Sequence, residues 1–437
     1  MTATVTFEPA ASRRQVGEVD HPAESRVQRA EERRVPGNHE QRAHGENARR
    51  AQRNNERRAL RNDEHLALRS NEHRAQRNDE QSSLRHLGPN WFAAVMGTGI
   101  VANAAVTLPL QFPGLRGAAT VIWVLAAAVL VAVSVAWLAH RIRFADTARD
   151  HREHPVMSQF FGAPPMALLT VGGGTLLLGS DVLGTPAAVA IDWVLWTAGT
   201  ALGLLTAFAI PYRMFTRHRV APDAAFGGWL MPVVPPMVSA TMGALLIPHT
   251  PAGQPRLTML VLCFAMFGLS LFAALIIIAM IWSRLVHHGT PPAGMVPTLW
   301  IVLGPLGQSV TAAGLLATAA PSVLPGSYAT GMLVFSVIFG IVTWGFAMLW
   351  LLLALAVTVK TARAGELRFN LTWWGFTFPV GTCVTGSTVL YTHTGADLFA
   401  IVAVTLFAML VGAWAVVATH TLRGIVTGAL LHPATAT

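Results

Sequence analysis

Long apolar stretches alternate with short polar segments from about Pro89 to His420. Each stretch is long enough to span a bilayer, because a membrane-spanning helix needs roughly 20 mainly apolar residues. The pattern predicts an all-α, polytopic membrane protein with ten transmembrane helices. The predicted segments, numbered one to ten in chain order, are 89–107, 117–139, 156–179, 187–210, 226–247, 258–283, 295–318, 329–357, 372–391 and 397–419.

Helix breakers distinguish the odd-numbered segments, which carry Gly or Pro near their middles, from the even-numbered ones, which contain no internal proline. An internal proline bends a helix, and in a membrane the freed backbone group must be satisfied by protein or cavity water. The alternation predicts five helical hairpins, pseudo-fivefold around a central pore, with odd-numbered helices inside and even-numbered ones facing lipid. The general enrichment of Gly and Pro in membrane helices is the alternative explanation. The predicted pore-lining residues include Gly97, Thr98, Gly99, Pro164, Pro235, Pro305, Pro379 and Thr382.

Positive charges fall mainly in alternate loops. The polar segments that follow the even-numbered segments hold twelve Arg and Lys residues, whereas the other loops hold only Arg116 and Arg256. Lys and Arg beside membrane helices are retained on the cytoplasmic side. This asymmetry predicts an even number of crossings and a multi-pass protein of the inner (plasma) membrane, with both termini in the cytoplasm.

The first 86 residues form a separate region that lacks the large apolar side chains needed for a core. They contain 17 Arg against 14 Asp plus Glu, and an eight-residue unit repeats four times between Arg50 and Gln81. We expect a disordered Arg-rich cytoplasmic tail at 1–86, for which a regulatory or binding arm is the alternative, a transmembrane domain at 87–420 and a cytoplasmic tail at 421–437. Most of the net charge of +9 then comes from basic residues in the loops that set the membrane orientation, and no nucleic-acid partner is predicted.

Groups able to carry chemistry are scarce in the predicted membrane domain. Cys263 and Cys383 belong to no CxxC motif and are expected to be buried small residues. No cofactor is predicted, and no metal site either, because the histidines near His151 lie among Arg residues that disfavour a cation. No pair of carboxylates or nucleophile with a base falls at one membrane depth, which argues against an enzyme. A proton-coupled carrier needs an ionisable relay inside the membrane, and only Asp192 and His393, both near segment ends, offer one.

The absence of Arg and Lys from the middle of the odd-numbered segments fits an anion route. A buried cation would hold an anion tightly, whereas conduction requires binding weak enough to permit exit. Small polar groups such as Thr98, Ser309, Thr311 and Thr382 can solvate an anion without trapping it. Passive passage of small anions is therefore favoured over a coupled carrier.

Two sequence strings resemble a known family. The opening of segment one, Pro89-Asn90-Trp91-Phe92-Ala93-Ala94-Val95-Met96-Gly97-Thr98-Gly99-Ile100, and the start of segment nine, Phe369-Asn370-Leu371-Thr372-Trp373-Trp374-Gly375-Phe376-Thr377-Phe378-Pro379, are similar to helices one and nine of the tellurite-resistance/dicarboxylate transporter family. This family includes tellurite-resistance anion channels, malate permeases, sulfite efflux pumps and plant slow anion channels. The resemblance covers about residues 88 to 420.

The resemblance implies a homotrimer in which each subunit has its own pore, blocked near mid-membrane by one phenylalanine. Carried onto this chain, that gate is Phe378, and Phe161 matches a second aromatic position facing the pore. Family members move dicarboxylates such as malate, sulfite, chloride or nitrate, so small anions are the expected substrates and the lipid bilayer the expected surroundings. A proton-coupled dicarboxylate carrier or a sulfite efflux pump is the alternative.

Overall fold

The computed structural model describes residues 84–217 and 219–430, together with scattered positions between 50 and 69. The chain divides into two compact units, Met1–Gln76 and Arg77–Thr437. The described positions between 50 and 69 are helical and exposed. The rest of the predicted tail, including the remainder of the four eight-residue repeats, lies outside the described residues, apart from the last three residues before 87. The second unit contains the apolar segments, and among its described residues all regular secondary structure is helical.

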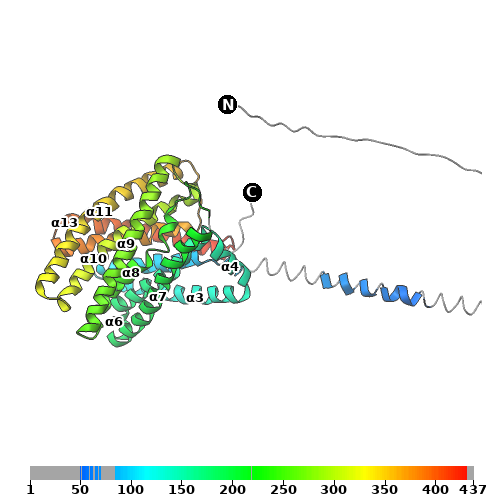
Figure 1. Cartoon of the computed structure of the whole chain (residues 1–437), viewed down its shortest axis with the longest axis horizontal. Helices are drawn as coiled ribbons and strands as arrows, with labels where there is room; N and C mark the ends of the chain where they lie inside the picture. Colours follow the sequence, from blue (N-terminus) through cyan, green and yellow to red (C-terminus); the bar gives the residue numbers. More distant parts are fainter. Residues whose placement is uncertain are drawn as a thin grey trace, which may run out of the picture. The chain divides into compact units, whose positions relative to one another are not determined.

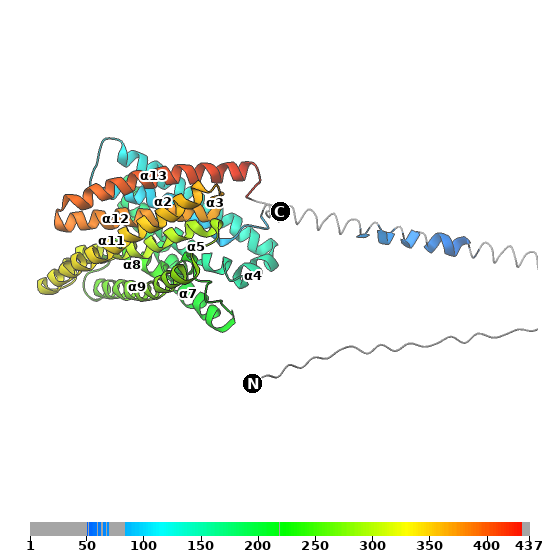
Figure 2. The ribbon, with the colours of Figure 1, turned by 90° about the horizontal axis from the view of Figure 1, so that it is seen from above.

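Five long helices coincide with the even-numbered segments. They are α3 (Leu115–Arg143), α7 (Thr185–Arg217), α9 (Gln254–His288), α11 (Gly326–Arg363) and α13 (Asp397–Val426). Each keeps one buried stripe and leaves many large apolar side chains exposed. Such an exposed apolar face is expected of a helix that contacts lipid. Each long helix packs against the inner α-helix that precedes it in the chain, and the helices can be followed in Figures 1 and 2.

The odd-numbered segments are shorter and composite. Each begins with 3₁₀ turns and continues as an α-helix that is buried on nearly all sides. In chain order these α-helices are α2 (Phe92–Thr107), α5 (Ala163–Gly174), α8 (Pro235–Leu246), α10 (Leu303–Ala319) and α12 (Phe378–Thr394). The 3₁₀ segments before them are η1 (Pro89–Trp91), η2 (Met157–Gly162), η4 (Gly227–Leu230), η6 (Ala293–Val302) and η8 (Leu371–Phe376).

Shorter pieces complete the second unit. After α5, a π-helical turn η3 (Thr175–Gly179) leads into α6 (Ser180–Leu183). The 3₁₀ turns η5 (Ile247–His249) and η7 (Ala320–Ser322) close two other inner segments, and α4 (Ala145–Glu153) lies between α3 and η2.

The prolines begin helices instead of bending them. Pro235 is the first residue of α8, Pro164 and Pro379 are the second residues of α5 and α12, and Pro305 is the third residue of α10. In the first turn of a helix the backbone N–H has no intrahelical partner, so the missing N–H of proline costs little there. The expected break is therefore a change from 3₁₀ to α geometry, which keeps most backbone groups bonded.

Two expectations about helix breakers are wrong. The helix α2 runs without interruption through Gly97-Thr98-Gly99, because these residues serve close packing and glycine alone does not stop a helix. An even-numbered segment does contain an internal proline, since α7 extends past its predicted end and includes Pro211.

The helix α13 also extends past its predicted end. It continues to Val426, into the region expected to be a C-terminal tail.

Seven helical stretches in the described part of the chain are long and apolar enough to cross a membrane. They comprise the five long helices and the composite stretches Met157–Leu183 and Ala293–Ser322. The remaining inner helices, α2, α8 and α12, contain 16, 12 and 17 residues. The second unit is thus a multi-pass membrane domain, while the count of ten crossings and the pseudo-fivefold symmetry stay predictions.

The chain just before segment one is anchored on the membrane unit. The Nδ1 atom of buried His140, at the end of α3, lies 2.9 Å from the carbonyl oxygen of Leu84, and the Arg85 guanidinium lies over the ring of Phe144. His151 of α4 stacks on His140, and its burial, together with that neighbour, lowers the pKa of His151 to about 4. The structural unit therefore begins before residue 87, the predicted boundary.

Glycine sets the closest approach between inner helices. A Cβ atom at Gly307 of α10 would lie 2.5 Å from the carbonyl carbon of Thr382 and 2.6 Å from the nitrogen of Cys383, both in α12. These are backbone atoms, so relief would require the two helices to separate. Close backbone approach through small residues is how membrane helices pack.

We expect Gly307→Ala to lower the melting temperature of the purified protein, because overpacking costs ~1–3 kcal/mol. The matched control is Gly412→Ala on exposed α13, where an added Cβ meets nothing within 4 Å. Replacing a glycine inside an exposed helix should stabilise it by about 0.5–1 kcal/mol. Equal melting temperatures for the two variants would contradict the proposed contact between α10 and α12.

Candidate functional site

Two cavities lie among the inner segments. The first has a volume of about 30 Å³ and is called the Phe378 cavity. Its walls are almost entirely apolar, and every wall residue belongs to an odd-numbered segment. They are Ala93, Met96, Phe160, Met166, Met231, Val234, Ile301, Gly304, Pro305, Leu371, Thr372, Trp374, Gly375, Phe378 and Pro379.

The second cavity, of about 70 Å³, is lined further along the same five segments and contains five threonines. We call it the threonine cavity. Its wall residues are Ile100, Asn103, Thr107, Leu177, Thr241, Met242, Leu245, Gln308, Thr311, Leu315, Thr385, Thr388 and Val389. The N-terminal parts of the inner segments therefore enclose one space, and their later parts enclose a second whose wall includes polar residues although its exposed surface is almost entirely apolar.

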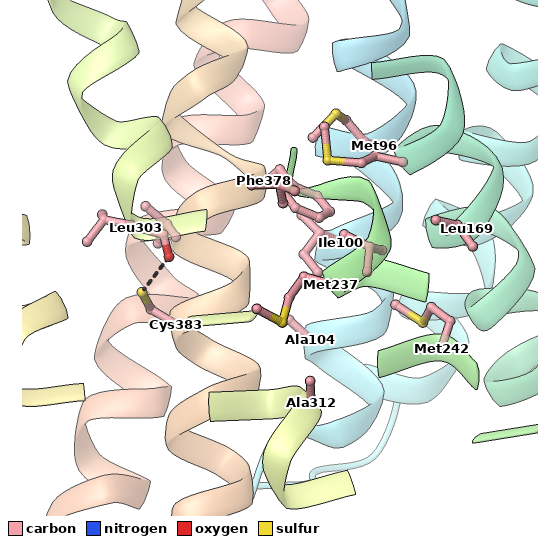
Figure 3. Close-up of a cluster of buried hydrophobic side chains, with 14 of the residues drawn as sticks. Met96, Ile100, Ala104, Leu169, Met237, Met242, Leu303, Ala312, Phe378 and Cys383 are labelled. Carbon is pink, nitrogen blue, oxygen red and sulfur yellow. Dashed lines mark hydrogen bonds between the residues drawn. The ribbon is translucent and has the colours of Figure 1, made fainter. Parts of the chain in front are cut away.

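Phe378 is the first residue of α12 and is 3% exposed. Its ring lies close to Met96 and Ile100 of α2, with Met237 of α8 directed toward the same space (Figure 3). Met96 lines the Phe378 cavity and Ile100 lines the threonine cavity. These apolar side chains therefore lie where one cavity gives way to the other.

No ionisable side chain lines either cavity within the described ranges. Asp192 of α7, near the predicted start of segment four, is fully buried. It faces α5, where a Cβ at Gly172 would lie 2.5 Å from its Oδ1. His393 lies at the end of α12, with Nε2 3.1 Å from the Thr318 hydroxyl and Nδ1 3.4 Å from the Ser336 hydroxyl. Cys263 and Cys383 are buried free thiols, as predicted.

The amino-acid sequence from residue 86 to residue 422 matches the family model of the voltage-dependent anion channel, SLAC1. The chain belongs to this family. The match covers all of the inner helices and all but the last turn of α13, and it confirms the resemblance seen in segments one and nine. It makes the protein a membrane transporter of an anion-transporting family.

Individual relatives of this family include proteins of different described activity. The chain is 29% identical over 345 residues to an uncharacterised transporter of Methanocaldococcus jannaschii, a match that covers 79% of this chain and 95% of the relative. It is 27% identical over 323 residues to a sulfite efflux pump of Trichophyton rubrum, covering 72% and 85%. It is 22% identical over 308 residues to a malic acid transport protein of Schizosaccharomyces pombe, covering 68% of each.

Within the SLAC1-family unit, three of the predicted site residues line a cavity, namely Phe378, Pro305 and Pro379. Phe161 does not. It is half-buried, and its ring packs edge-on against Trp137 of α3 with centroids 6.3 Å apart. The preceding residue, Phe160, lines the Phe378 cavity in its place. The 3₁₀ geometry of η2 turns these two adjacent rings to different sides.

The predicted residues of segment one face neighbouring helices. A Cβ at Gly97 would collide with Thr377 and Trp374, and one at Gly99 would lie 2.8 Å from Thr170 of α5. The Thr98 hydroxyl donates to the Ala94 carbonyl oxygen at 2.8 Å and accepts a hydrogen bond from the indole N–H of Trp414 in α13. These residues let helices approach and do not line the cavities.

The other predicted residues also serve packing. Pro235 meets α7, because a Cβ at Gly203 would lie 2.9 Å from its side chain. Pro164 is buried and lines neither cavity. The Thr382 hydroxyl is directed at backbone oxygens, 2.7 Å from the Pro379 oxygen and 3.2 Å from the Leu303 oxygen.

Several wall residues were not anticipated from the sequence, notably Gln308, Asn103 and Thr385. A signal for them exists. The wall residues of segment one are Ala93, Met96, Ile100, Asn103 and Thr107, and those of segment seven include Ile301, Gly304, Gln308, Thr311 and Leu315. Both sets follow a spacing of three and four residues, which places side chains on one helix face.

Phe160→Ala should raise anion flux through reconstituted protein, because removal of this ring from the wall enlarges the Phe378 cavity. Phe161→Ala should leave flux near the wild-type value and lower stability by ~0.5–1.5 kcal/mol through the lost aromatic pair. Flux into liposomes and melting temperature measure the two effects. Equal flux changes in both variants would show that the assignment of the cavity wall is wrong.

Proposed function

We propose that the chain provides a passive route for small anions through the space between the five inner segments, closed by the ring of Phe378. The observation that carries this proposal is the series of two cavities lined by the odd-numbered segments alone. An axial series of spaces with uncharged walls is what a pore in its closed form requires. Membership in an anion-transporting family supports the same reading.

The electrostatics favour anions without a binding cation in the wall. The helices α10 and α12 contribute first-turn residues, Pro305 and Phe378 among them, to the wall of the Phe378 cavity, and helix N-termini carry partial positive charge. Basic residues such as Arg141, Lys360 and Arg363 lie at the C-terminal ends of outer helices. Fixed positive groups at a pore mouth raise the local concentration of anions.

The substrate belongs to the class of small anions, with sulfite, malate and other dicarboxylates, chloride and nitrate as candidates. The names of two relatives favour sulfite and malate. The proposal includes a homotrimer with one pore in each subunit, located in the plasma membrane with both termini in the cytoplasm. The charge asymmetry of the loops supports that orientation.

A proton-coupled carrier is a second candidate because of Asp192. Both carboxylate oxygens of this fully buried residue have no hydrogen-bond partner among the described residues. Ionisable groups inside membrane segments are costly and are commonly functional, including as proton relays. Asp192 lies between α7 and α5 instead of lining a cavity, so it could act only by altering how those helices pack.

Phe378→Ala should increase anion conductance while cation permeability stays low. Removal of the ring opens the apolar constriction, and a barrier lowered by ~1.4 kcal/mol would raise the flux about tenfold. Planar-bilayer currents in asymmetric salt measure the conductance and the reversal potential. A well-folded Phe378→Ala protein with unchanged flux would reject Phe378 as the gate.

The matched control is Phe376→Ala. Phe376 lies two residues earlier, packs edge-on against Trp300 and Trp373, and lines neither cavity. This variant should lose stability through its two aromatic contacts, each worth ~0.5–1.5 kcal/mol, without a gain in conductance. A fall in melting temperature of Phe378→Ala with no new current would identify Phe378 as a packing residue only.

If transport is coupled to protons through Asp192, Asp192→Asn should abolish substrate accumulation driven by a pH gradient but leave passive exchange intact. Asp181→Asn is the control, because Asp181 is exposed and paired with Arg116 at 2.6 Å. Liposome uptake with and without an imposed pH gradient distinguishes the outcomes. Wild-type flux that ignores the gradient would eliminate the coupled carrier.

A further inference from the structure

The threonine cavity opens toward the C-terminal ends of the inner segments. Its wall residues that come earlier in each segment, such as Asn103, Thr241 and Gln308, are buried, with Thr385 the exception. The last wall residue of every inner segment is half-buried, and these five are Thr107, Leu177, Leu245, Leu315 and Val389. Because exposure rises toward these residues, the mouth of the cavity lies among them, at the end opposite to the Phe378 cavity.

Four of the five residues at the mouth are apolar, and they come from segments three, five, seven and nine. We call them the mouth ring, which consists of Leu177, Leu245, Leu315 and Val389. Two members come from helices in direct contact, since a Cβ at Gly314, the residue before Leu315, would collide with the Val389 side chain. The exposed surface of the cavity is almost entirely apolar. Hydrophobic constrictions of this kind close pores by excluding water.

Leu177 has a different backbone setting from the rest of the mouth ring. It belongs to the π-helical turn η3, and single π turns within helices are rare and occur frequently at functional sites. The Arg116 guanidinium of α3 donates to the Leu177 carbonyl oxygen at 3.1 Å and to the Asp181 carboxylate of α6 at 2.6 Å. One exposed ion pair therefore ties this turn to α3. A change of the turn to α-helical hydrogen bonding would rotate the Leu177 side chain about the helix axis.

We infer that the mouth ring is a second constriction of the pore, in series with Phe378 and on the other side of the threonine cavity, with Leu177 as a principal member. This inference rests on the proposed function and goes beyond it, because it adds a barrier that the Phe378 ring does not form. A charged solute loses hydration at an apolar constriction without gaining a donor. The mouth ring should therefore limit the flux once Phe378 is truncated.

The conductance test adds Leu177→Asn to the Phe378→Ala protein. Asparagine keeps nearly the shape of leucine but attracts water, so the anion conductance of the double variant should exceed that of Phe378→Ala at least about tenfold. Leu176→Asn is the control, because Leu176 lies in the same π turn, is half-buried and lines neither cavity. This control should leave the conductance of Phe378→Ala unchanged. Equal conductance with and without Leu177→Asn would overturn the second constriction.

A labelling test on the purified full chain needs no current. Thr241→Cys places a thiol in the buried wall of the threonine cavity, and the wild type sets the background, because Cys263 and Cys383 are buried. With Phe378 intact, Leu177→Asn should speed the reaction of this thiol with a charged methanethiosulfonate at least about tenfold, and Leu176→Asn should not. If Leu177→Asn fails to fold, Leu315→Asn serves the same test.

An unchanged labelling rate in a folded Leu177→Asn or Leu315→Asn protein would overturn the mouth ring as a barrier. Failure of the pore proposal would give a different result. In that case the thiol at position 241 would react faster in the Leu177→Asn protein, but the Phe378→Ala protein would carry no anion current.

Discussion

The need to satisfy backbone hydrogen bonds away from water governs this structure. An inner helix interrupted at mid-segment would expose N–H and C=O groups that lipid cannot satisfy. The chain meets this constraint by changing from 3₁₀ to α geometry, and in α5, α8, α10 and α12 a proline occupies the first turn of the new helix. The inner segments can change direction in this way only when surrounded by protein, which is why the five long, smooth helices lie outside them.

The same constraint explains why the wall of the cavities is neutral. Threonine hydroxyls along the inner helices bond to carbonyl oxygens four residues earlier, as Thr241 and Thr311 do. These hydroxyl groups are thereby satisfied within their own helices, need no buried charge as a partner and turn little polar surface toward the cavity. A charged side chain at the same depth would require a partner or would bind a passing counter-ion too firmly for conduction.

Much of this architecture could be predicted from sequence because proline and apolar length act locally. The inner and outer sets of helices follow from the alternation of broken and smooth segments. The residues that line the cavities could not be assigned with the same success. An inner helix is buried on every side, so its sequence shows no difference in hydrophobicity between the side that faces a cavity and the sides that pack against other helices. Thr98 and Gln308 look equally suitable in the sequence, but only the tertiary contacts show that Thr98 bonds to Trp414 while Gln308 borders the cavity. Phe160 and Phe161 differ for the same reason.

The uncharged walls have a physical consequence for an anion in the proposed pore. In the Phe378 cavity the anion would lose hydration without gaining donors, so this apolar constriction would be the barrier to passage. Phe378 begins α12, whose backbone meets α10 at Gly307. A movement of α12 that displaced the Phe378 ring would therefore also have to break or slide this backbone contact, so opening of the proposed gate would be coupled to the packing of α10 on α12.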